Sequence, residues 1–144
     1  MHKVYLAGQP NEYSDNWKED LKLVEGFDFY DWEFDSDQTS ADTFFPDDLH
    51  AVKNADFMIA NPGTAPSEGT WIEIGYFYAN NTEKPGEFCD RLIIVWEEDR
   101  LPVWSIAFVK KAGFVVGSVS EAQEKLKELR IIAEKNFPKK QKSV

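Results

Sequence analysis

Short apolar runs recur along the chain and predict buried strands. Most of them are continuous rather than alternating, which is typical of parallel strands that helices cover on both faces. One further segment alternates aromatic and acidic residues, and it predicts a half-buried strand. The continuous runs lie at 4–8, 56–60, 91–96 and 113–116, and the alternating segment FDFYDWEF lies at 27–34. We therefore expect about five strands.

Between these strands the apolar residues recur at helical spacing, which predicts helices there. Trp17, Leu21 and Val24, for example, fall on one face of a helix at 17–24. Strands that alternate with helices predict a three-layer α/β sandwich of flavodoxin-like or Rossmann-like type, with a parallel sheet of about five strands. We expect one domain over 1–137 and a basic tail at 138–144. The remaining helices are expected at 46–54, with Pro46 in the first turn, and at 68–80, 104–111 and 120–137.

Composition narrows the classes of function. The chain of 144 residues has a formal net charge of −10, and such a surface repels phosphate backbones, so we expect no nucleic-acid polymer as partner. The single cysteine, Cys89, excludes an internal disulfide. No run of about 18 apolar residues is present, and the first residues, MHKVYLAG, lack the long apolar region of a signal peptide. We therefore expect a cytoplasmic protein without a membrane span.

Candidate chemistry gathers where the predicted strands end. Ligands of parallel sheets bind beyond the carboxyl ends of the strands, so Gly8, the loop at 61–66 and the start of the next helix should surround one crevice. Two carboxylates belong to this region, Asp48 before the third strand and Glu73 after it. Glu73 stands between two isoleucines, where a carboxylate is costly unless it is paired, neutralised or used. Periodicity alone also allows both acids to complement helix dipoles, and Tyr5 to be a core aromatic.

Several segments together resemble the nucleoside 2-deoxyribosyltransferase superfamily, which includes the deoxynucleoside 5'-monophosphate N-glycosidases. The most specific is EGTWIEIGYFYA at 68–79, a GTxxExGxxxA-like pattern. The others occur in the family's order over about residues 3 to 110, and they are VYLAG at 4–8, DL at 48–49, KNAD at 53–56 and KP at 84–85.

This resemblance implies a catalytic set and a reaction. Glu73 corresponds to the nucleophile that attacks the anomeric carbon of the sugar and forms a covalent glycosyl-enzyme. Asp48 corresponds to the general acid that handles the proton of the departing base, and Tyr5 to the tyrosine that orients the nucleophile. The reaction needs no metal or organic cofactor. His2 and His50 are in any case not spaced with acids as a metal site requires.

The identity of the substrate stays open between two classes. Ser67 stands where many transferases have an aspartate, and the monophosphate hydrolases also have serine there. The first loop, GQPNEYSDNW at 8–17, contains no lysine or arginine to bind a phosphate. We therefore expect transfer of a deoxyribosyl group from a 2'-deoxynucleoside to another free nucleobase. Hydrolysis of a deoxynucleoside 5'-monophosphate is the alternative, and an inactive nucleotide-binding module is a third possibility.

The resemblance also implies substrate contacts and an assembly. Gly8, Ser67 and Gly69 are expected at the substrate, and relatives complete each site with an asparagine or serine from a neighbouring subunit. Ser105 is the better match for that residue and Trp104 the alternative, so we expect a homodimer or a larger homo-oligomer. Gln38 is a candidate for the base edge, and Trp32, Phe34 or Phe44 for stacking. Solvated loop acids and core aromatics are the alternative explanation of the same residues, and the pattern favours it.

Overall fold

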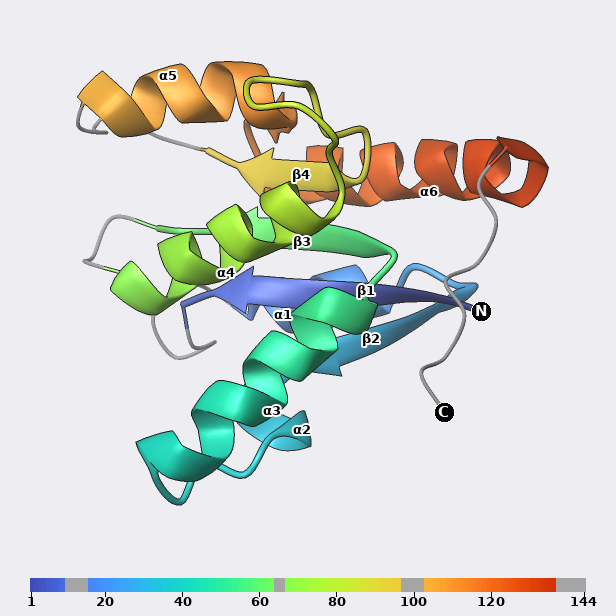
Figure 1. Cartoon of the computed structure of the whole chain (residues 1–144). Helices are drawn as coiled ribbons and strands as arrows, with labels where there is room; N and C mark the ends of the chain where they lie inside the picture. Colours follow the sequence, from blue (N-terminus) through green and yellow to red (C-terminus); the bar gives the residue numbers. More distant parts are fainter. Residues whose placement is uncertain (10–15, 64–66, 97–102, 137–144) are drawn as a thin grey trace.

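The computed structural model describes residues 1–9, 16–63, 67–96 and 103–136, with the backbone alone at 103–107. In these residues five strands form one sheet in the order β2-β1-β3-β4-β5, and all neighbouring strands are parallel. Figure 1 shows the sheet between helices. The strands are β1 (His2–Gly8), β2 (Phe27–Asp31), β3 (Phe57–Asn61), β4 (Leu92–Val95) and β5 (Phe114–Val116).

Helices pack on both faces of this sheet, which confirms the predicted three-layer α/β fold. One face is covered by α1 (Trp17–Lys22) and α6 (Val119–Asn136), and the other by α3 (Ala41–Asn54), α4 (Glu68–Asn80) and α5 (Val103–Ala112). Successive strand residues point to opposite faces, so Val4 and Leu6 join the first core layer while Tyr5 and Ala7 join the second. The continuous apolar runs are therefore buried from both sides.

Two predicted boundaries are wrong, and local capping explains both. The segment at 27–34 was expected as one strand, but β2 ends at Asp31 and the short helix α2 (Trp32–Asp35) follows. The Asp31 carboxylate accepts the backbone N–H of Glu33 at 3.1 Å and so begins the helix. Likewise α3 begins at Ala41 rather than near Pro46, because the Ser40 N–H donates to Thr43 Oγ1 at 3.2 Å ahead of its first turn.

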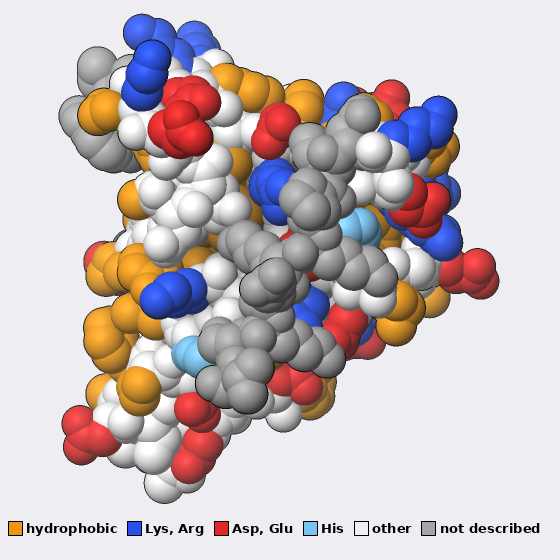
Figure 2. Space-filling view, turned by 45° about the vertical axis from the view of Figure 1, so that its right-hand side comes forward, with side chains coloured by type: hydrophobic (Ala, Val, Ile, Leu, Met, Phe, Trp, Pro, Cys, Tyr) orange, Lys and Arg blue, Asp and Glu red, His pale blue; other side chains and the backbone are white. Residues whose placement is uncertain are grey.

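Two further features concern the surface charge and the hydropathy of the helices. Acidic and basic side chains are interspersed among the described residues on the face that Figure 2 shows. No helix in the described segments is both long and apolar enough to cross a membrane. The predicted basic tail at 138–144 lies outside the described residues.

Candidate active site

A cavity of about 390 Å³ opens beyond the carboxyl end of β1 and beside the first turns of α4. This is the side of the sheet where the chain switches between β1 and β3, the usual ligand position in such folds. The volume falls within the range of about 300–1,000 Å³ that is common for small-molecule sites. The lining residues are Gly8, Gln9, Trp32, Gln38, Phe44, Phe45, Asp48, Leu49, Ser67, Glu68, Gly69, Thr70, Ile72 and Glu73.

Glu73 is held at this cavity by a tyrosine from another element. Tyr5 is fully buried on β1, and its hydroxyl donates a hydrogen bond to Glu73 Oε2 on α4, 68 residues along the chain. Burial raises the pKa of Glu73 to about 7, the charge of Asp48 adds to this rise, and the hydrogen bond from Tyr5 opposes it. Burial and the charge of Glu73 raise the pKa of Tyr5, so its hydroxyl stays protonated and remains a donor.

Asp48 is held by a second tyrosine that stacks on the first. The Tyr30 hydroxyl lies 3.4 Å from Asp48 Oδ1, and the Tyr30 ring lies on the Tyr5 ring with centroids 5.3 Å apart and planes 16° apart. Burial raises the pKa of Asp48, the charge of Asp47 adds to it, and hydrogen bonds from Ser36 and Tyr30 oppose it. Two stacked tyrosines therefore connect the two carboxylates.

Tyr30 is a site residue whose role the sequence analysis missed. Tyr5 and Tyr30 are direct partners in the register of β1 and β2, and neighbouring positions of parallel strands on the same face bring their side chains together. The pair of tyrosines in two predicted strands was the available signal. Without the register of the strands it did not point to a shared site.

Most of the predicted substrate residues lie on the cavity. Gly8, Ser67, Gly69 and Gln38 all line it, together with both carboxylates. Part of the Gln38 amide is already engaged, because its nitrogen donates to Trp32 O at 3.3 Å. Ser105 lies in α5, where the structure describes its backbone but not its side chain.

The aromatic candidates divide into two groups. Trp32 and Phe44 line the cavity, and Phe45 joins them there. Phe34 does not, because its ring is mostly exposed and lies 4.9 Å from Lys22 Nζ. The stacking surface available to a planar ligand is therefore formed by α2 and the first half of α3.

Apolar and acidic side chains both line the cavity. Its carboxylates are Asp48, Glu68 and Glu73, and among the described lining residues there is no lysine, arginine or histidine. No three His, Cys, Asp or Glu side chains in the described segments are grouped closely enough to hold a metal ion. The arrangement offers a carboxylate held by a tyrosine, a second acid and aromatic walls to a small ligand.

Comparison with known proteins finds similarity at the level of the structure and none at the level of the sequence. No family model and no curated protein matches the sequence. The structure is similar to that of a CMP N-glycosidase, BcmB, from Clostridium botulinum, with a TM-score of 0.53 and 23% identity over 87% of this chain and 98% of that chain. The chain therefore has the fold of this N-glycosidase, which confirms the predicted α/β architecture.

Proposed function

We propose that the protein cleaves the N-glycosidic bond of a nucleoside or nucleotide, with Glu73 as the nucleophile. The observation that carries this proposal is the Glu73 carboxylate on the cavity, mostly buried, bonded to the Tyr5 hydroxyl and in no ion pair with a described residue. Burial of a carboxylate without a cation costs stability, and such costs are typical of functional sites.

The proposed reaction proceeds in two displacements at the anomeric carbon of the sugar. Glu73 Oε1 attacks this carbon while Tyr5 holds Oε2, and the bond to the base nitrogen breaks with its electron pair going to the base. The protonated Asp48 supplies a proton to that base. A second nucleophile then attacks from the opposite face, gives its proton to Asp48 and releases Glu73, so the configuration is retained.

Transfer between nucleobases from an uncharged 2'-deoxynucleoside is the first candidate. The three carboxylates of the lining repel a phosphate dianion, and the described lining residues contain no cation to offset them. The loop that follows Gly8 adds none, because residues 9–17 contain no lysine or arginine. The aromatic wall of α2 and α3 suits a planar acceptor base once the first base has left.

Hydrolysis of a nucleoside 5'-monophosphate is the second candidate, and two observations favour it. Ser67 lines the cavity just before the first turn of α4, where a hydroxyl and helix amides suit an anion. The fold is also that of an enzyme described as a CMP N-glycosidase. Water then takes the place of the acceptor base.

Product analysis separates the two candidates. The protein is incubated with deoxyinosine and adenine, with deoxynucleoside monophosphates alone and with CMP alone, and the products are separated by chromatography. New deoxyadenosine supports transfer, whereas free base from a monophosphate supports hydrolysis. Glu73→Ala is the control and reduces either activity to background, and a 2'-fluorinated substrate leaves a sugar adduct on Glu73 by mass spectrometry. No cleavage of any of these compounds refutes the proposal.

Asp48→Asn tests the proton transfer. The amide cannot donate the proton that the departing base requires, so we expect cleavage to slow by a factor of about 10² to 10⁴. A base that leaves without protonation should be affected much less. Asp42→Asn is the matched control, because Asp42 is exposed on the same helix α3 and does not line the cavity. If the rate of Asp48→Asn is unchanged, Asp48 is not the proton donor and only complements the dipole of its helix.

A further inference from the structure

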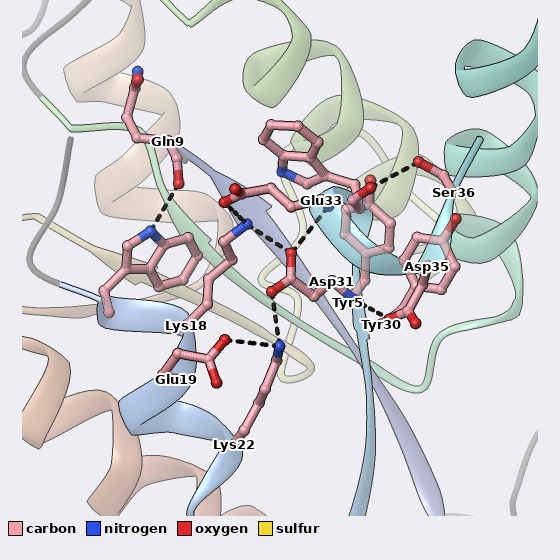
Figure 3. Close-up of polar contacts among 12 residues, drawn as sticks. Tyr5, Gln9, Lys18, Glu19, Lys22, Tyr30, Asp31, Glu33, Asp35 and Ser36 are labelled. Carbon is pink, nitrogen blue, oxygen red and sulfur yellow. Dashed lines mark hydrogen bonds and ion pairs between the residues drawn. The ribbon is translucent and has the colours of Figure 1, made fainter. Parts of the chain in front are cut away.

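A buried ion cluster lies at the carboxyl end of β2, behind the cavity wall. Lys18 is fully buried on α1, and its Nζ lies 2.6 Å from Asp31 Oδ1 and 2.5 Å from Glu33 Oε1. Lys22 Nζ contacts the other oxygen of Asp31 at 2.8 Å. Figure 3 shows these side chains converging from α1 and from the end of β2.

Stability alone does not explain a lysine at this position. Taking an ammonium group out of water is costly, and a buried ion pair commonly contributes no more than apolar residues of similar volume do. Trp17 and Leu21, which belong to the same helix α1, are part of the hydrophobic core. The position of the charge therefore calls for a role beyond packing.

Lys18 also contacts an aromatic wall of the cavity. Its Nζ lies 4.6 Å from the centroid of the Trp32 ring, within the range of a cation–π interaction. Trp32 lines the cavity, whereas Lys18 does not. The backbone of Trp32 is fixed as well, because it begins the helix that Asp31 caps and its carbonyl accepts the Ser36 hydroxyl at 2.9 Å. Backbone and ring are thus both held at the cavity.

We propose that Lys18 is a positioning residue, which holds the Trp32 indole as the surface on which a nucleobase stacks. The inference rests on the proposed function, since it needs a planar base in the cavity. Stacking is tolerant of the identity of the base, so Lys18 acts on affinity for nucleosides in general. The cation–π contact favours the orientation in which the Trp32 ring lies beside the Lys18 ammonium and lines the cavity.

Two lysine variants distinguish an effect of the charge beside Trp32 from a general effect of losing a charge in the ion cluster. Lys18→Met removes the charge beside Trp32, and we expect the KM for a deoxynucleoside to rise about 3- to 30-fold, the range of cation–π contributions, while kcat changes far less. Lys22→Met removes an equal charge from the same Asp31, but its ring contact is Phe34 at 4.9 Å. We expect that control to keep the wild-type KM. An equal rise in KM for both variants overturns the inference.

A second comparison uses Trp32 itself. Trp32→Leu should raise the KM, and adding Lys18→Met to it should raise the KM no further, because the contact through which Lys18 acts is gone. A merely structural role of Lys18 predicts the same change with and without Trp32, and that result refutes the inference. Should Lys18→Met not fold, Glu33→Gln replaces it, since Glu33 is 25% exposed and holds the same ammonium. No rise in KM for a folded Glu33→Gln then counts against the inference.

The wild-type protein distinguishes failure of the inference from failure of the proposed function. If it neither cleaves nor binds deoxynucleosides, nucleoside monophosphates or free adenine in calorimetry, the proposed function is wrong and the inference is wrong with it. If the wild type cleaves these compounds while Lys18→Met and Lys22→Met have the same KM, the proposed function stands and the positioning role of Lys18 is refuted.

Discussion

At the scale of single residues, two opposing effects set the pKa of the Glu73 carboxylate. Burial pushes the pKa of Glu73 to about 7, and the Tyr5 hydroxyl stabilises the ionised form against it. The nucleophile must be ionised to attack, so we expect cleavage to decline as the pH falls through this value. The charge of Asp48 contributes to the raised pKa of Glu73, so the protonation state of Asp48 also affects this decline.

Tyr5→Phe tests the contribution of the hydroxyl. The hydrogen bond from Tyr5 lowers the pKa of Glu73, so its loss raises that pKa above its wild-type value of about 7. We therefore expect the acidic limb of the kcat/KM profile to move to higher pH and kcat to fall. Tyr30→Phe is the matched control, since it keeps the bond between Tyr5 and Glu73. An acidic limb that stays in place in Tyr5→Phe shows that the bond does not tune the nucleophile.

Glu73→Gln should make the folded protein more stable at alkaline pH. The pKa of Glu73 is raised from 4.5 to about 7 on folding, so the folded state binds the proton more tightly. The stability of the wild type accordingly falls as the pH rises through this interval, and above it the full cost of the buried charge is present. The glutamine carries no charge, and we expect about 1–3 kcal/mol more stability at high pH. Urea denaturation at about pH 8 and pH 4 measures the difference, which should vanish in acid.

At the scale of elements, the close approach of β1 to its neighbours shapes the cavity mouth. Gly8 ends β1 with a φ of 153°, and a Cβ there would lie 2.3 Å from the Asn61 carbonyl oxygen and 2.8 Å from the Trp17 ring. Only glycine fits this position without displacing backbone. The end of β1 can therefore lie against β3 and α1 at once and still line the cavity.

Gly8→Ala should both destabilise the protein and weaken the site. Crowding of this kind costs typically about 1–3 kcal/mol, and the shift of β1 also displaces the cavity lining. Gly117→Ala is the control, because its Cβ would meet only the flexible carboxylate of Glu121, at 3.4 Å. Chemical denaturation and the rate of cleavage are measured on both variants. Equal stabilities of the two would contradict the packing argument.

Element boundaries show where sequence reasoning is weakest. The apolar runs located the strands because burial on both faces leaves no polar positions. The transition at Asp31 and the start of α3 were placed wrongly, since two single hydrogen bonds decided them. The Asp31 carboxylate accepts one from the Glu33 N–H, and the Ser40 N–H donates the other. Such bonds depend on backbone geometry that a hydrophobic pattern does not contain.

At the scale of the whole molecule, the cavity has an exposed apolar rim. Phe45 on α3 is 55% exposed and Ile72 on α4 is 57% exposed, and both line the cavity. Neighbouring exposed apolar residues are typical of interaction surfaces. This rim is therefore the surface on which we expect the predicted homodimer to form.

Ile72→Glu tests this assembly. A charge in an apolar interface is costly, so we expect the variant to sediment as a monomer while the wild type sediments as a dimer or larger oligomer. Ile131→Glu is the matched control, because Ile131 is 60% exposed on α6, which covers the opposite face of the sheet. We expect that variant to keep the wild-type sedimentation. A monomeric wild type contradicts the predicted assembly.

The sequence by itself determined the class of fold and pointed to Glu73, Asp48 and Tyr5 through a resemblance. It was able to do so because continuous apolar runs and short motifs are local properties of the chain. Only the tertiary structure showed the hydrogen bond between Tyr30 and Asp48 and the contact between Lys18 and the Trp32 ring. The raised pKa of Glu73 is of the same kind, since it arises from burial and from groups distant in the sequence. Contacts of this sort depend on strand register and helix packing, which no local pattern records.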